Sequence, residues 1–174
     1  LWIIITICLC TYLVEGTITD WSSVYLRDVI GASEAIAGRG FAVYAFFMAT
    51  GRFMGDDLMA RYGSLHVLKG GGFLCVTGLL IVIISTSHLF AMPGFALIGA
   101  GISLASPILY QASAKVKGLA PGIGLATMNT FAMTAFLGGP VLIGFVAQLF
   151  TLRIAFLFVL LAALLWIIQT SLII

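Results

Sequence analysis

Charged residues are scarce in this sequence, and their scarcity excludes a soluble globular protein. Only 8% of the 174 residues are charged, whereas 62% are hydrophobic. A soluble domain needs a polar surface, and eight Lys/Arg with six Asp/Glu cannot supply one. The net charge of +2 is small and scattered, so it gives no sign of a nucleic-acid partner. The composition therefore predicts an integral membrane protein whose surroundings are the lipid bilayer.

Sequence signals for metals, cofactors and export are also missing. Cys8, Cys10 and Cys75 have no metal-ligand spacing and form no even framework, so we interpret them as buried packing residues. No phosphate-binding Gly-Lys-Ser/Thr motif is present, so ATP is not indicated and we expect no cofactor. Residues 1–5 are LWIII, with no initiator Met and no basic segment, which is unlike a signal peptide. This beginning is typical of a fragment cut at the start of a span.

Long apolar runs are what the sequence has in abundance. A helix needs about 20 mostly apolar residues to cross a hydrocarbon core of about 30 Å. The runs are continuous, which favours helices over the short alternating strands of a membrane barrel. We therefore expect an all-α integral membrane protein with six transmembrane helices. The predicted spans cover about residues 1–28, 36–56, 67–86, 89–113, 120–149 and 152–173.

Basic residues are divided unevenly between the two ends of these spans. Five Lys and Arg fall on one side and three on the other: Arg52, Arg61, Lys69, Lys115 and Lys117 against Arg27, Arg39 and Arg153. The positive-inside rule then places the loops at 56–67 and 113–120 in the cytoplasm. With an even number of spans, both ends of this chain are expected to be cytoplasmic, in the cell (inner) membrane.

Glu15 is a carboxylate deep inside the first predicted span. At a rise of 1.5 Å per residue it lies about 21 Å along the helix, where a charge costs on the order of 3 kcal/mol and is normally partnered or functional. Its face of the helix is shared by Thr11, Tyr12, Thr19 and Ser22. Such a polar stripe faces a neighbouring helix or a wet cavity. We expect Glu15 to bind a proton or the substrate, and the alternative is a structural hydrogen bond to another helix.

Weaker candidates for a cavity lie elsewhere along the spans. Asp20 comes further out on the first span, and we weigh it evenly between a ligand at the outer mouth and a solvated charge. Tyr44, Tyr110 and Asn129 are polar positions in the second, fourth and fifth spans. Residues of this kind more often form hydrogen bonds between helices than contacts with a ligand. Ser106-Pro107 and Gly138-Gly139-Pro140 predict bends, which are typical of helices around the cavity of a secondary transporter.

The densest cluster of charge lies between the second and third spans, where residues 51–63 read GRFMGDDLMARYG. This segment resembles the signature loop between the second and third helices of a half in the major facilitator superfamily. Asp56 stands where an early Gly is usual, while Arg61 and Gly63 fit the later positions. Ala60 departs from the family by replacing an acidic residue, a role that Asp56 and Asp57 would take over one turn earlier.

Two further segments carry the same resemblance. Residues 15–26, EGTITDWSSVYL, resemble the start of the second half of bacterial fucose-permease-like transporters, and residues 138–147, GGPVLIGFVA, fit the fifth span of that group. The resemblance implies one domain over 1–174, the carboxy-terminal half of a twelve-helix transporter. It also implies two inverted three-helix units, at about 1–86 and 89–173, and an amino-terminal six-helix half as partner.

The resemblance also implies roles for the signature loop. In the family this loop locks helices across the cytoplasmic side, so its residues would be gating residues. The candidates are Arg52, Gly55, Asp56, Asp57, Arg61 and Gly63. Because acidic side chains are unfavourable at the C-terminal end of a helix, we expect Asp56 and Asp57 to have a cationic partner.

The resulting hypothesis is proton-coupled transport of a small solute by alternating access, with Glu15 as the coupling residue and no enzymatic activity. An intramembrane hydrolase is a weaker alternative, because Glu34 follows Ser33 where a Gly is wanted and both His lie in predicted loops. A six-helix protein that self-associates as a dimeric transporter, channel or scaffold is the other alternative. No evenly spaced polar face runs the full length of one helix, which argues against a simple pore.

Overall fold

The structure, a computed structural model that describes residues 1–118 and 120–173, is all helical over that part of the chain. The predicted fold class is therefore confirmed at the level of an all-α protein. The helices are α1 (Trp2–Asp28), α2 (Glu34–Phe53), α3 (Gly55–Tyr62), α4 (Ser64–Ile84), α5 (His88–Ile102), α6 (Ala105–Ala114), α7 (Pro121–Leu149) and α8 (Leu152–Ile173).

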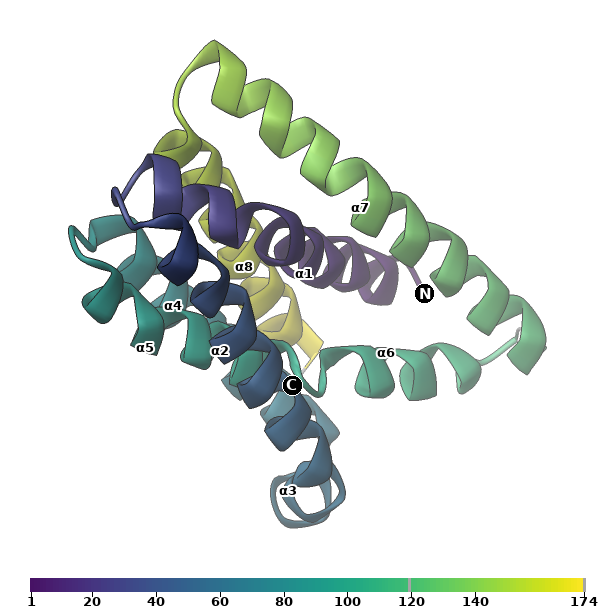
Figure 1. Ribbon diagram of the computed structural model, residues 1–174. Helices are drawn as coiled ribbons and strands as arrows, with labels where there is room; N and C mark the ends of the chain where they lie inside the picture. The colour runs from purple at the N-terminus through teal and green to yellow at the C-terminus, as the bar shows by residue number, and fades with distance from the viewer. Residues whose placement is uncertain (119, 174) are drawn as a thin grey trace.

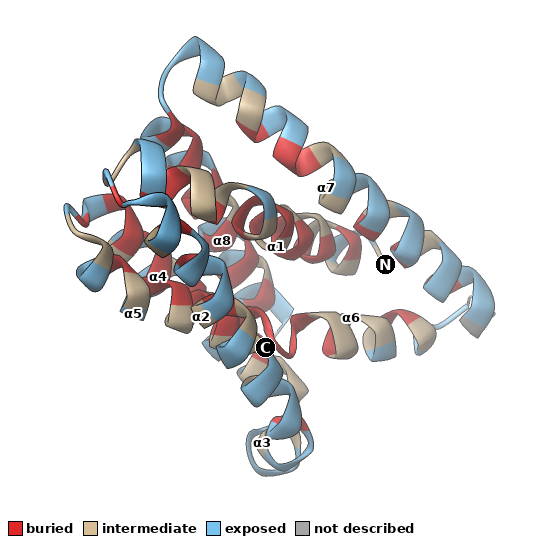
Figure 2. Cartoon of the chain, in the orientation of Figure 1, coloured by how far each residue is buried: buried red, intermediate tan, exposed pale blue. Residues whose placement is uncertain are grey.

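The helices run back and forth between two ends of the molecule, and α1 lies at the centre (Figure 1). The α1–α2, α4–α5 and α7–α8 turns gather at the upper left, whereas α3 and the α6–α7 connection lie at the opposite end. Helix α1 packs against α2, α6, α7 and α8, while α2 and α7 do not contact each other among the described residues. Many α1 residues are accordingly buried, as Figure 2 shows in red.

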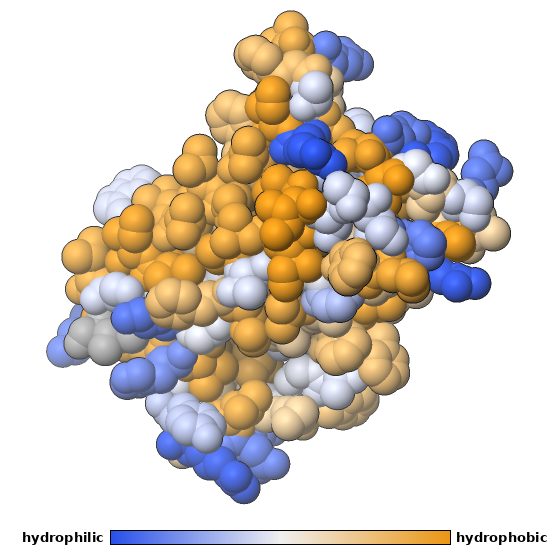
Figure 3. Space-filling view, turned by 90° about the vertical axis from the view of Figure 1, so that its left-hand side faces the viewer, coloured by the Kyte–Doolittle hydropathy of each residue, from blue (hydrophilic) through white to orange (hydrophobic). Residues whose placement is uncertain are grey.

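Five helical stretches are long and apolar enough to cross a membrane: α1, α4, α5 with α6, α7 and α8. Helix α2 has 20 residues, but it carries Glu34, Arg39 and Arg52 and is not among the five. Apolar side chains cover most of the face in Figure 3, with hydrophilic groups towards its upper and lower ends. This distribution suits a protein whose middle faces lipid.

The fourth predicted span is broken, and the break is not where the bend was predicted. Helix α5 ends at Ile102 and α6 begins at Ala105, so Ser103 and Leu104 form a two-residue joint, a turn whose dihedral angles stay in the right-handed helical region. Pro107 explains this position, because proline has no N–H for the carbonyl four residues earlier and its ring clashes with that carbonyl. By contrast, α7 continues through Pro140 as a single helix.

The charged segment after α2 is a short helix of its own, which corrects our expectation for its acidic residues. The second predicted span was to reach residue 56, but α2 ends at Phe53 and α3 begins at Gly55. Asp56 and Asp57 therefore lie in the first turn of α3 and Arg61 in its last turn. Both positions are favourable for the helix dipole, so the reason for expecting a cationic partner does not hold, and the partner itself stays a prediction. Gly63 ends α3 with φ at +79°, a conformation that favours glycine.

Candidate functional site

Glu15 and Arg52 bring opposite charges together between α1 and α2. Glu15 is half-buried on α1, and the positive charge that acts on its carboxylate is that of Arg52, in the last turn of α2. The hydroxyl of Thr19 donates a hydrogen bond to the Glu15 backbone carbonyl at 2.8 Å. The charges of both Glu15 and Arg52 also act on the hydroxyl of Tyr44. The predicted carboxylate therefore faces a neighbouring helix that carries a cation.

Tyr44 adds an unsatisfied hydroxyl to this region. Its side chain is 2% exposed, and its hydroxyl makes no hydrogen bond among the described residues. Ser22 lies one turn beyond Thr19 on α1, and its buried hydroxyl also has no hydrogen-bond partner among the described residues. Buried polar groups are usually hydrogen-bonded, to protein or to water. The hydroxyls of Tyr44 and Ser22 therefore each have an unused capacity for hydrogen bonding.

Tyr110 and Asn129 are joined by a direct hydrogen bond between α6 and α7. The Tyr110 hydroxyl donates to Oδ1 of Asn129 at 2.8 Å. Tyr12, on the Glu15 side of α1, has its hydroxyl beside Tyr110 and Ser106. Two candidates that are 19 residues apart in sequence are thereby linked to the helix that carries Glu15.

We call this group of side chains the polar cluster. It draws residues from α1, α2, α6 and α7: Tyr12, Glu15, Tyr44, Arg52, Tyr110 and Asn129. It combines one carboxylate, one guanidinium and neutral donors and acceptors. Such a set can bind a proton, or the polar groups of a small solute, within apolar surroundings.

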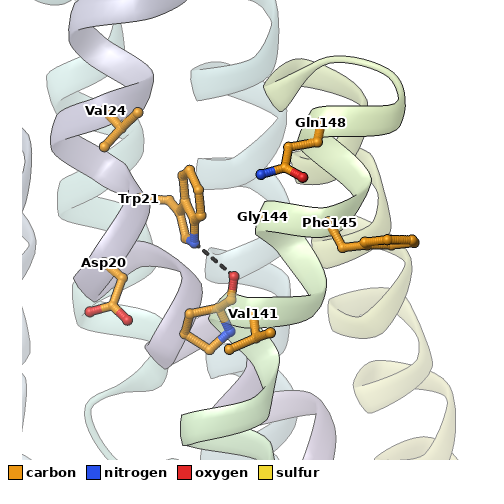
Figure 4. A pocket seen from close by; sticks show the side chains of 8 residues that line it. Asp20, Trp21, Val24, Val141, Gly144, Phe145 and Gln148 are labelled. Carbon is orange, nitrogen blue, oxygen red and sulfur yellow. Dashed lines mark hydrogen bonds between the residues drawn. The ribbon is translucent and has the colours of Figure 1, made fainter.

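Asp20 does not belong to the polar cluster. Asp20 is five positions after Glu15. At 3.6 residues per turn this spacing places the two side chains about 140° apart around the helix. Asp20 is exposed and lines a pocket of about 520 Å³ between α1 and α7 (Figure 4). There Trp21 Nε1 donates a hydrogen bond to the Pro140 carbonyl at 3.0 Å. Asp20 and Glu15 therefore lie on different faces of α1, and the role of Asp20, as a ligand at the outer mouth or as a solvated charge, stays a prediction.

The candidate gating residues divide between two places. Arg52 belongs to the polar cluster and is exposed near the end of α2, and Asp56, Asp57 and Arg61 are exposed on α3. None of these three makes an ion pair within residues 1–118 and 120–173, where the recorded pair joins the adjacent Arg27 and Asp28. Gly55 is buried, and the Leu104 side chain lies against it.

Sequence reasoning missed the contacts that hold α1 against α7. Gly16 lies so close to α7 that a methyl group there would come within 2.8 Å of the Phe136 carbonyl oxygen. Pro140 is four residues after Phe136 and cannot donate to that carbonyl. The position of Pro140 was the available signal, because a proline in a helix frees a carbonyl that another helix can approach. No group of three or more metal-ligating side chains occurs in the described part of the chain.

Two bacterial transporters are similar to this chain in sequence. An uncharacterized MFS-type transporter of Yersinia pestis is 37% identical over 150 residues, which is 86% of this chain and 39% of that protein. An uncharacterized transporter of Sinorhizobium fredii is 34% identical over 153 residues, or 88% of this chain and 41% of that protein. The chain thus spans about two-fifths of the length of these relatives.

Solved structures agree on the fold. The crystal structure of the peptide transporter POT in complex with sulfate matches 98% of this chain and 37% of that chain, with a TM-score of 0.85 and 15% sequence identity. At that identity the likeness shows the fold alone. No protein-family model matches the sequence. Because the two bacterial relatives are 34–37% identical over most of its length, the chain belongs to the major facilitator superfamily.

Proposed function

We propose that this chain is the carboxy-terminal six-helix half of a secondary transporter that moves a small solute by alternating access, coupled to protons. In this proposal α2 also crosses the membrane, in addition to the five apolar stretches, which gives six spans. The two inverted units cover about 1–86 and 89–173. The relatives are about two and a half times as long as the matched segment, which leaves room for an amino-terminal half. The fucose-permease-like group remains our expectation for the subfamily.

The observation that carries the proposal is the half-buried carboxylate of Glu15 on α1, on which the positive charge of the exposed Arg52 on α2 acts. A carboxylate inside a membrane bundle is costly, and such residues typically relay protons or bind substrate. The deprotonated carboxylate attracts the guanidinium of Arg52, and a proton on Glu15 removes that attraction. Protonation would then release Arg52 for a polar solute and change how α1 and α2 interact.

The exposed charges of α3 support a gating role at the cytoplasmic end. Asp56, Asp57 and Arg61 project from α3 at the end of the molecule that also carries Lys115 and Lys117. The positive-inside rule assigns this end to the cytoplasmic side of the cell (inner) membrane. We expect these side chains to contact the amino-terminal half when the cytoplasmic side is closed.

The coupling role is tested with the full-length protein in proteoliposomes that contain the pH-sensitive dye pyranine. A panel of sugars, amino acids, short peptides and organic ions is screened for solutes that cause proton movement. We expect Glu15→Gln to lose solute-driven proton movement but to keep exchange of labelled for unlabelled solute, because exchange needs no net proton transfer. Glu34→Gln, an exposed carboxyl at the start of α2, is the matched control and should behave like the parent protein.

Uptake by Glu15→Gln that a pH gradient still drives at the parental rate would rule out the coupling role. The second candidate, a self-associating six-helix channel or scaffold, has no specific observation in its favour. We assign the protein no enzymatic activity, in keeping with relatives that are named as transporters.

A further inference from the structure

The joint between α5 and α6 is buried, and its two residues form a turn whose backbone dihedral angles stay in the right-handed helical region. Ser103 is 1% exposed and Leu104 is 6% exposed. The Ser103 hydroxyl donates a hydrogen bond to the Ala100 carbonyl at 2.7 Å, within its own turn. No hydrogen bond from either side chain to α2, α3 or α4 is recorded among the described residues. Van der Waals contact alone therefore holds the joint against these helices.

Two of the three glycines of the charged segment, Gly51 and Gly55, lie against this joint. Gly51 is in the last turn of α2, and a methyl group there would overlap the Ser103 hydroxyl and lie 2.7 Å from its Cβ. Gly55 begins α3, and a methyl group there would lie 2.6 Å from Cδ2 of Leu104. Two glycines four residues apart thus contact the two joint residues, one against each. We call Gly51 and Gly55 the socket.

A pocket borders both the joint and Gly51 of the socket. It has a volume of about 510 Å³ and is enclosed by α2, α3, α4 and α5, with Gly51, Ser103 and Leu104 among its lining residues. Its walls are almost entirely apolar, apart from Tyr62 and His66. The joint therefore has free volume beside it, and no polar contact has to break before it moves into that volume.

The joint sets the position of α6, and α6 carries Tyr110. Tyr110 donates its hydrogen bond to Asn129 on α7 and lies beside Tyr12 on α1. A small rotation at Ser103–Leu104 therefore moves Tyr110 relative to both partners. The socket lies on the segment that continues into α3, where the exposed candidate gating charges are found.

We propose that Gly51 and Gly55 are positioning residues: their missing side chains form a socket in which the Ser103–Leu104 joint turns, so that displacement of α3 changes the Tyr110–Asn129 contact in the polar cluster. The mechanical link depends on the contacts described above. Only its consequence for transport rests on the proposed function.

The link is tested in the full-length protein with all other cysteines replaced and a Tyr110→Cys/Asn129→Cys pair introduced. The rate of disulfide cross-linking by copper phenanthroline is measured on the folded, monodisperse fraction in lipid nanodiscs. We expect Gly51→Ala to lower this rate several-fold, because its methyl group displaces Ser103 and with it α6. Gly38→Ala is the matched control, since it lies on the same helix and a methyl group there meets nothing within 4 Å.

A compensating variant separates positioning from general damage. Ser103→Gly removes the atoms that the new methyl group would meet, so Gly51→Ala/Ser103→Gly should recover the cross-linking rate. An unchanged rate in Gly51→Ala would overturn the proposal, and so would failure of Ser103→Gly to restore it. If Gly51→Ala yields no folded protein, the same double variant decides, because recovery of folded, cross-linking protein supports the socket and continued loss contradicts it.

This experiment needs neither a solute nor a gradient. Its failure would therefore leave the transport hypothesis intact, while failure of the Glu15→Gln experiment would leave the socket intact.

Discussion

At the scale of single residues, the polar cluster contains groups whose partners come from other helices. Glu15 on α1 faces Arg52 on α2, and Tyr110 on α6 bonds to Asn129 on α7. A carboxylate near a guanidinium costs less in an apolar setting than either charge alone. The side chains that are most costly to place in a membrane therefore lie at contacts between helices. Mutation of one partner leaves the polar group of the other without its partner.

The contribution of one contact between helices to stability can be measured at a hydrogen bond outside the polar cluster. Trp21→Phe keeps an aromatic ring but removes the Nε1 donor to the Pro140 carbonyl. Hydrogen bonds between membrane helices average about 0.6 kcal/mol, so the free energy of unfolding should fall by about that amount. Unfolding in SDS followed by circular dichroism measures it. Trp2→Phe on the same helix, where the ring is 75% exposed, should change little, and an equal loss in both variants would contradict the prediction.

At the scale of helices, close approach between α4 and α5 depends on small residues. Gly71 lies against Gly101, and Gly78 lies against Gly94, so two pairs of glycines let the backbones touch. In lipid no hydrophobic effect drives helices together, and packing at such contacts supplies much of their attraction. These four glycines of the third and fourth predicted spans are therefore contact residues.

Replacing two glycines of α4 separates this packing from helix propensity. Gly78→Ala and Gly70→Ala both exchange a glycine inside the same helix for alanine, which favours the helix by about 1 kcal/mol. A methyl group at Gly78 would lie 2.5 Å from the Gly94 carbonyl oxygen, whereas one at Gly70 meets nothing within 4 Å. We expect a lower melting temperature for Gly78→Ala and an unchanged or higher one for Gly70→Ala. Equal or greater stability of Gly78→Ala would show that α4 and α5 are not so close.

At the scale of the whole molecule, charge gathers at the two ends and apolar side chains between them. Helix α7 presents large apolar side chains outward along much of its length, with Leu137, Val141 and Phe145 each more than 60% exposed. Figure 2 shows this helix largely in the colour of exposed residues. Such a surface is suited to lipid or to another apolar protein surface.

The orientation of the chain in the membrane follows from its charges and can be measured. Thr86 and Lys117 are exposed, and they lie in connections at opposite ends of the molecule. In full-length protein without other cysteines, we expect a membrane-impermeant maleimide to label Thr86→Cys in intact cells. Lys117→Cys should react only in inside-out vesicles, because the positive-inside rule keeps its loop in the cytoplasm. The reverse labelling pattern would overturn the proposed orientation.

The local features of this protein could be predicted from its sequence. Membrane helices satisfy their backbone hydrogen bonds within the segment itself, so an apolar run of sufficient length is enough to predict one. The depth of Glu15 and its polar neighbours on one face likewise follow from the helical repeat. The burial of Thr11, Tyr12 and Ser22 agrees with that expectation.

The tertiary structure alone decided which residues meet. The Glu15–Arg52 and Tyr110–Asn129 pairs join different helices, and no local rule states which faces of two helices come together. The same holds for Asp20, which faces α7 instead of the polar cluster, and for Gly51 and Gly55, which lie against Ser103 and Leu104. Sequence by itself determined that the chain forms apolar helices, because that choice is local. Their packing decided the polar cluster and the socket, because both arise from contacts between residues far apart in the chain.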